Sequence, residues 1–221
     1  QEDATPEGAK HDTFTRSAES AKEAEALAAF YPQTLSVDLP GGSIRIKAPR
    51  GTRPVALKAT RAKILAILKN ADPACVRRIA ESKLEVAVFA LNMNLTHLPE
   101  FRHGAGARNA FNQRFEELAG ACSTILVDGR QTRPVLGISE DDILRINPNL
   151  QSAFHHELAH VLHRVGLSAE QKDQLDAIYR DARRRHLFEH KYAMVSVDEF
   201  FAEMTQAYFD TEPYFCSSAQ L

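Results

Sequence analysis

The chain has 221 residues, 44% of them hydrophobic, and its 27 basic and 29 acidic side chains leave a net charge of −2. This composition is typical of a globular protein with an apolar core, and the balanced charge argues against a dedicated nucleic-acid-binding protein. No stretch of the sequence reaches the roughly 20 apolar residues that a membrane-spanning helix needs, which excludes a membrane span.

The first 82 residues predict a tail followed by helices and one hairpin. Residues 1–16 are polar and predict a flexible N-terminal tail, and residues 17–82 predict a helical and hairpin region. Apolar and polar residues alternate on both sides of Pro40-Gly41-Gly42, which is a turn sequence. The elements expected here are helices over 17–30, 62–68 and 73–82, the last opened by Asp72-Pro73, and strands over 35–39 and 43–47.

Residues 83–221 predict strands first and helices afterwards, and we expect an α+β fold. The strands are expected over 84–89, 124–127, 135–138 and 143–146, and a helix over 109–118. From Gln151 onward the pattern is helical. The helices are expected to run from 151 to Gly166, from a capping box of Ser168 and Gln171 to about residue 186, and over 198–209.

Cysteine content and the start of the chain bear on its compartment. Cys75, Cys122 and Cys216 allow at most one disulfide bridge, and their spacing leaves its pairing open. The sequence begins at Gln1 with a polar segment, which is typical of a chain after removal of a signal peptide. We therefore expect a secreted or extracytoplasmic protein, and its oligomeric state stays open.

The segment His156-Glu157-Leu158-Ala159-His160 is an HExxH motif on a predicted amphipathic helix. Residues four apart lie one above the other on a helix, so the two imidazoles can bind one zinc ion. Glu157 would then lie beside the metal as the general base for a zinc-bound water. The alternative is a surface helix with incidental histidines, but apolar residues such as Leu158 and Val161 favour a buried helix.

A third ligand must come from elsewhere in the chain. A metzincin has glycine three residues and histidine six residues after the second histidine, whereas His163 and Gly166 occupy these positions in the opposite order. His163 lies about 10 Å along the axis from His156, too far to share its zinc ion. We expect His163 to be a cation at the helix end or part of the pocket wall.

Glu199 and Glu203 are the candidates for this ligand, because both lie on one face of the helix expected over 198–209. We favour Glu199, with Glu203 as the alternative ligand. Ser196 and Glu199 also fit a capping box, which would direct the Glu199 carboxylate to the backbone instead.

The HExxH motif, Tyr192 and the run Glu199-Phe200-Phe201-Ala202-Glu203 resemble the catalytic domain of anthrax lethal factor-like zinc metalloproteases. This gluzincin group includes the Pro-Pro endopeptidases. The resemblance covers roughly residues 123–210 and implies a zincin-like domain, here 83–221, with one zinc ion per chain. It implies Glu199 as the third ligand and Glu203 as a carboxylate that holds a histidine ligand in its correct tautomer. Tyr192 would stabilise the oxyanion or protonate the leaving amine; without the resemblance it would be an ordinary half-buried aromatic residue.

These residues predict a zinc-dependent endopeptidase that hydrolyses peptide or protein substrates. The strand expected over 135–138 would line the cleft and pair with an extended peptide. The alternatives are a metal-binding regulatory or interaction protein with little peptidase activity, and hydrolysis of a non-peptide amide. Glu157 favours an enzyme, because metal binding alone does not require a general base.

Overall fold

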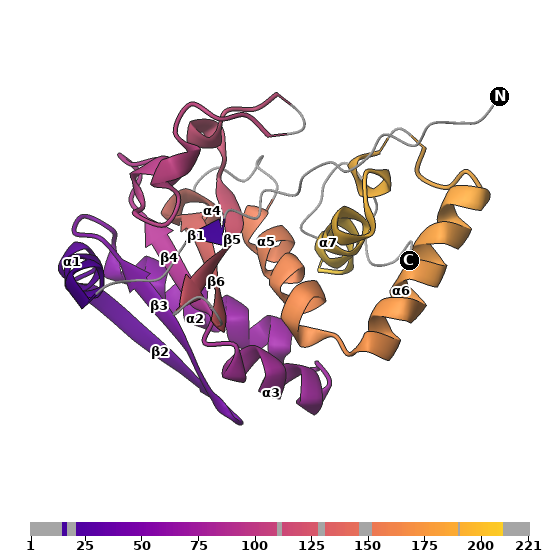
Figure 1. Cartoon of the computed structure of the whole chain (residues 1–221), viewed down its shortest axis with the longest axis horizontal. Helices are drawn as coiled ribbons and strands as arrows, with labels where there is room; N and C mark the ends of the chain where they lie inside the picture. The colour runs from indigo at the N-terminus through magenta and orange to yellow at the C-terminus, as the bar shows by residue number, and fades with distance from the viewer. Residues whose placement is uncertain are drawn as a thin grey trace.

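The computed structural model describes residues 15–16, 21–109, 112–127, 131–145, 152–189 and 191–209, which form a mixed six-stranded sheet with helices on both faces (Figure 1). The strand order is β1-β5-β6-β4-β3-β2. The strands are β1 (Thr15–Arg16), β2 (Gln33–Leu39), β3 (Gly42–Ala48), β4 (Glu85–Phe89), β5 (Gly120–Val127) and β6 (Gln131–Ser139). This architecture agrees with the predicted α+β class.

Strand pairing joins the two predicted regions of the chain. The hairpin of β2 and β3 is confirmed and is antiparallel, with Leu39 opposite Gly42. β3 pairs with β4, and β4 with β6, in parallel, whereas β5 and β6 are antiparallel. The predicted boundary at residue 83 thus falls between two paired strands of one sheet. Thr15 and Arg16, the end of the predicted tail, pair with β5.

Alternating side chains of β4 face two different cores, one on each side of the sheet. Val86 and Val88 face the core under three helices, whereas Ala87 and Phe89 face the core under α1 and several short 3-10 turns. The first core lies beneath α2 (Pro54–Leu68), α3 (Pro73–Glu81) and α5 (Ala153–Val161), and the second beneath α1 (Ala21–Phe30). Since all five residues of β4 are buried, this strand is the centre of the fold.

A third core connects the C-terminal helices. The π-helical turn Leu162–Gly166 continues α5, and α6 (Ala169–Arg184), the 3-10 turn Tyr192–Met194 and α7 (Val197–Tyr208) follow it. Ala182, Ala193 and Phe200 form the centre of this core. α7 packs on α5, so that α5 lies between the sheet and α7 (Figure 1). No helix in the described parts of the chain is long and apolar enough to cross a membrane.

Local capping signals account for the helix starts that were predicted correctly. The Asp72 side chain accepts a hydrogen bond from the Ala74 backbone, and Ser168 and Gln171 form the predicted capping box of α6. α2 begins at Pro54, eight residues before the predicted start, because proline at the first helical position is itself a start signal. The predicted helix 17–30 is described from Ala21.

The predicted helix over 109–118 is wrong. Arg108 and Arg114 form an isolated antiparallel bridge, and only Phe115–Glu117 make a 3-10 turn, while residues 110–111 lie outside the described chain. The Asn109 side chain accepts a hydrogen bond from the Gln113 backbone at 3.0 Å. Such side-chain bonds compete with helix formation, and they close a tight loop here.

The predicted strand over 143–146 is also wrong, because residues Glu140–Leu144 form the short helix α4; Ile146 lies outside the described residues. Ser139 caps this helix by accepting a hydrogen bond from the Asp141 backbone at 3.1 Å. Three acidic residues in the first turn, Glu140, Asp141 and Asp142, further favour a helix start.

The segment 135–138 is a strand, as predicted, but it cannot pair with a peptide. It belongs to β6, which is bonded to β4 on one side and β5 on the other. The strand with an open edge beside the helices is instead β5. In the described part of the chain, β1 covers β5 only at Thr124 and Ile125, which leaves Gly120–Ser123 uncovered on that side.

Candidate metal centre

Both histidines of the motif lie on α5, whose orientation is fixed at its start and along its apolar face. The Asp142 carboxylate accepts hydrogen bonds from the backbone N–H groups of Ala153, at 2.8 Å, and Phe154, at 3.1 Å. Phe154 and Leu158 are fully buried in the first core. Because this face points to the sheet, the opposite face turns His156 and His160 toward α7.

The first turn of α7 brings Glu199 to these histidines. Ser196 caps the helix by accepting a hydrogen bond from the Glu199 backbone at 3.2 Å. The Glu199 side chain does not return to the backbone as a capping box would require. Its Oε2 lies 3.0 Å from His156 Nε2 and 3.6 Å from His160 Nε2. Glu199 therefore donates its backbone N–H to the Ser196 cap while its carboxylate faces the histidines.

His156, His160 and Glu199 form a buried group that could hold a metal ion. One donor atom from each residue lies within 4.8 Å of the other two. Among the described residues, this is the group of His, Cys, Asp or Glu side chains that meets the condition for holding a metal ion. Ligands about 2.0–2.1 Å from a tetrahedral cation are separated by about 3.3 Å. The two nitrogen–oxygen distances of 3.0 and 3.6 Å lie on either side of this value.

Gln206 determines which ring nitrogen of His156 carries a proton. Sequence reasoning missed this residue. Gln206 Nε2 donates to the Ser152 carbonyl at 3.0 Å, which turns the amide oxygen toward His156 Nδ1 at 2.9 Å. Since this oxygen only accepts, Nδ1 carries a proton and Nε2 faces Glu199. The Nε2 lone pair cannot face a carboxylate directly, so the two groups require a cation between them, either a second proton or a metal ion.

Charges around the group also favour a cation. Burial opposes protonation of His156, but the neighbouring carboxylates of Glu199 and Glu203 raise its pKa well above the ordinary value. Burial raises the pKa of the Glu199 carboxyl, but the nearby imidazoles of His156 and His160 lower it overall. Both shifts show that the surrounding carboxylates stabilise a positive charge at this position, and a metal ion would supply such a charge.

Asp198 is the second residue that sequence reasoning missed. Its Oδ1 lies 3.1 Å from His160 Nδ1 and 2.7 Å from His163 Nδ1. Burial opposes ionisation, but the interactions with His160 and His163 lower the pKa of the Asp198 carboxyl overall. His163 thus contacts an aspartate beside the group rather than the group itself. An acidic residue in the first turn of a helix is ordinarily explained by the helix dipole, so nothing in the sequence pointed to this role of Asp198.

Glu157, Tyr192 and Glu203 line the same cavity as the three ligand candidates. The Tyr192 ring stacks on His156 with 5.7 Å between centroids and an interplanar angle of 7°. Burial and the Glu199 carboxylate raise the pKa of Tyr192, so its hydroxyl keeps its proton and can donate. Glu203 Oε1 lies 3.3 Å from His156 Nδ1, beside the Gln206 oxygen.

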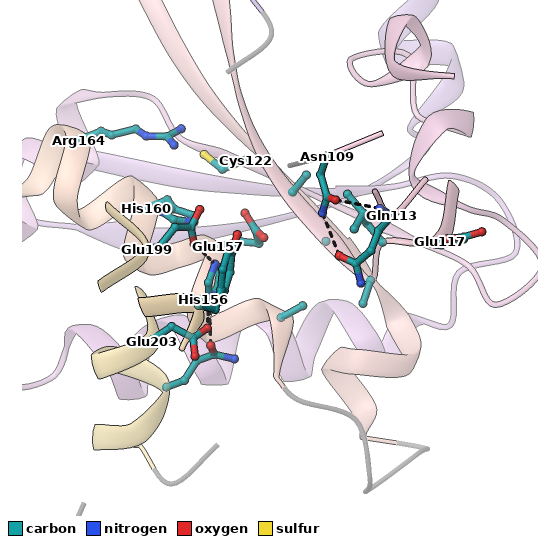
Figure 2. A pocket seen from close by; sticks show the side chains of 17 residues that line it. Asn109, Gln113, Glu117, Cys122, His156, Glu157, His160, Arg164, Glu199 and Glu203 are labelled. Atoms are coloured by element: carbon teal, nitrogen blue, oxygen red, sulfur yellow. Dashed lines mark hydrogen bonds and ion pairs between the residues drawn. The ribbon is translucent and has the colours of Figure 1, made fainter. Parts of the chain in front are cut away.

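The cavity has a volume of about 570 Å³. Figure 2 shows the HExxH residues, Glu199 and Glu203 on one side, Asn109, Gln113 and Glu117 opposite them, and Arg164 with Cys122 toward one end. The cavity is also lined by Leu118, Ala119, Gly120, Ala121, Ala153 and Gln206. This volume is in the range of small-molecule and peptide side-chain sites.

Comparisons with known proteins assign neither a family nor a function to the chain. No family model matches the chain, and neither curated proteins nor solved structures give a significant match. The function must therefore be inferred from the site itself.

Proposed function

We propose that the chain is a zinc-dependent endopeptidase of the gluzincin type. The observation that carries this proposal is the convergence of His156, His160 and Glu199, with Glu157 lining the same cavity. Two imidazoles and one carboxylate leave a fourth tetrahedral position open, which is the ligand set of catalytic rather than structural zinc sites. The resemblance to anthrax lethal factor-like metalloproteases supports the same set of residues.

When bound, zinc would polarise the peptide carbonyl and lower the pKa of a coordinated water to about 7. The residues of the chain supply the rest. Glu157 takes the proton of the attacking water and passes it to the leaving amine. Tyr192 donates its hydroxyl proton in a hydrogen bond to the oxyanion that develops on the carbonyl. Gln206 keeps His156 in the tautomer that leaves Nε2 for the metal.

An extended peptide would lie along the open edge of β5. Gly120, Ala121 and Cys122 line the cavity, and β1 pairs with β5 only beyond them in the described chain. Backbone groups on this edge can bond a peptide as an added strand. This binding mode brings main-chain carbonyls of a peptide to the metal and favours peptides over small amides.

The test combines metal analysis with a peptide screen. Purified wild-type protein should hold about one zinc ion per chain and cleave members of a mixed peptide library at sites with a shared local pattern. The Glu157→Ala variant should keep the zinc and lose cleavage by about 100-fold or more. A wild-type protein that binds no zinc after reconstitution, or binds it and cleaves no peptide, contradicts the proposal; the second result would favour a metal-binding regulatory protein.

A further inference from the structure

Asp198 occupies a buried position that the proposed reaction does not use. It precedes Glu199 in the first turn of α7 and is only 5% exposed. Its two carboxylate oxygens face three groups from α5 and the π-helical turn that follows it: His160, His163 and Arg164. A carboxylate so far from water needs these partners to remain charged.

Arg164 fixes the orientation of this carboxylate. Its Nε and one terminal nitrogen donate to Asp198 Oδ2 at 3.2 and 2.7 Å. Both N–H groups converge on Oδ2 and anchor this oxygen, and because the carboxylate is planar they also fix where its second oxygen lies. The other oxygen, Oδ1, is therefore held toward the two histidine rings rather than free to rotate away from them.

His160 needs an acceptor for its buried Nδ1. Asp198 Oδ1 is at hydrogen-bond distance, 3.1 Å, although the N–H is not aimed straight at it and has no better-aligned acceptor in the described chain. A carboxylate beside Nδ1 keeps the imidazole proton on that nitrogen. The lone pair of Nε2 is then directed toward Glu199, as Gln206 arranges for His156.

We propose that Asp198 is a positioning residue for the ligand His160. Held by Arg164, it keeps the imidazole proton on Nδ1 and so presents Nε2 to the metal. This inference rests on the proposed function, because it presupposes that His160 binds zinc. The competing explanation is that Asp198 only joins the end of α5 to α7, which would affect stability but not metal affinity.

The test is the zinc dissociation constant, measured by competition with a chromophoric chelator. Asp198→Asn keeps the shape of the side chain but removes its charge, and we expect it to weaken zinc binding by about 10- to 100-fold. The control is Asp181→Asn, an exposed aspartate of α6 that pairs with arginines and lies apart from the cavity lining. It should bind zinc as the wild type does.

Two further measurements separate positioning from packing. His163→Gln disturbs the same helix junction but leaves Asp198 beside His160, so it should keep zinc affinity within about threefold of the wild type. The melting temperature of the metal-free proteins reports packing alone. If Asp198→Asn does not fold without metal, Asp198→Glu, which keeps the charge and displaces it, should show the same weakening.

The outcomes distinguish this inference from the function on which it rests. Wild-type zinc affinity in Asp198→Asn, or equal weakening in His163→Gln, overturns the positioning role and leaves the endopeptidase proposal standing. Zinc binding that weakens only in the Asp198 variants, without any peptide cleavage by the wild type, supports the positioning role and contradicts the endopeptidase. Absence of zinc from the reconstituted wild type overturns both.

Discussion

Glu157 lies against the backbone of Gly120, where β5 enters the cavity. A Cβ atom on Gly120 would stand 3.2 Å from Glu157 Cγ and 2.8 Å from Ile138 Cδ1. The position of the proposed general base is thus set by the lack of a side chain on the neighbouring strand.

Gly120→Ala should therefore displace Glu157 and lower kcat/KM by about 10-fold or more, since small displacements of a catalytic group are costly. Zinc content should not change, because none of the three atoms nearest to the new methyl group belongs to a ligand. Steady-state cleavage of a fluorogenic peptide and elemental analysis would check both. Gly51→Ala is the control: its Cβ meets nothing within 4 Å and adds backbone strain alone at φ 97°. Equal losses in the two variants would contradict this account.

Tyr192→Phe should lower kcat by about 100-fold while zinc affinity stays near that of the wild type. The phenylalanine ring can keep the stacking on His156, but the hydroxyl that would donate to the oxyanion is gone. Single-turnover kinetics with the same peptide would measure the effect. A fall in zinc content without a change in kcat per bound zinc would instead assign Tyr192 to the support of His156.

Lys47→Met should destabilise the protein by about 3–5 kcal/mol, because it removes the cation from a buried charge group. Lys47 is 1% exposed, and its Nζ lies 2.5 Å from a carboxylate oxygen of both Glu85 and Glu100. Urea denaturation of the two proteins gives the difference in the free energy of unfolding. Lys58→Met, at an exposed position of α2, should stay within about 0.5 kcal/mol of the wild type. A similarly small effect for Lys47 would show that the buried group contributes little.

Cys122 should be an unreactive thiol in the folded protein. Burial raises its pKa to about 12, against the smaller opposing influence of Arg164. At pH 8 only about one thiol in ten thousand is then ionised, far less than in an unfolded chain. Mass spectrometry after iodoacetamide treatment should find Cys122 modified in denaturant but not in its absence. Rapid modification of the folded protein would be inconsistent with the buried thiol.

The same shift makes stability depend on alkaline pH. Between about pH 9 and 12 the unfolded state releases the Cys122 proton and the folded state keeps it, so the free energy of unfolding falls as pH rises. Cys122→Ala should flatten this fall. Urea denaturation of both proteins at several pH values would check it, and parallel curves would contradict the assignment.

The parts of the fold that could be predicted depend on short-range sequence patterns. The hairpin around Gly41, the capping box of α6 and the helix of the HExxH motif depend on residues within one or two turns of each other. Where a local side chain redirected the backbone, periodicity misled: Asn109 closes a loop where a helix was expected, and Ser139 starts a helix where a strand was expected.

Long-range relations in the site could not be predicted in the same way. Nothing in a sequence states that Gln206 meets His156 fifty residues earlier, or that β6 lies inside the sheet while β5 has the open edge. Glu199 could be placed among the candidates because it shares a helical face with Glu203. The histidine atoms that Glu199 approaches could not be predicted, nor could the contact of Asp198 with His160. Both depend on the packing of α7 on α5.

The division of the proposed ligands between two helices has a consequence for unfolding. α5 belongs to the core of the sheet, whereas α7 contributes Phe200 to the separate core that it forms with α6. An ion held by His156, His160 and Glu199 would act as a cross-link between these two parts. The opening of the C-terminal helices would then depend on the concentration of free metal, and a chelator would loosen them before it disturbed the sheet.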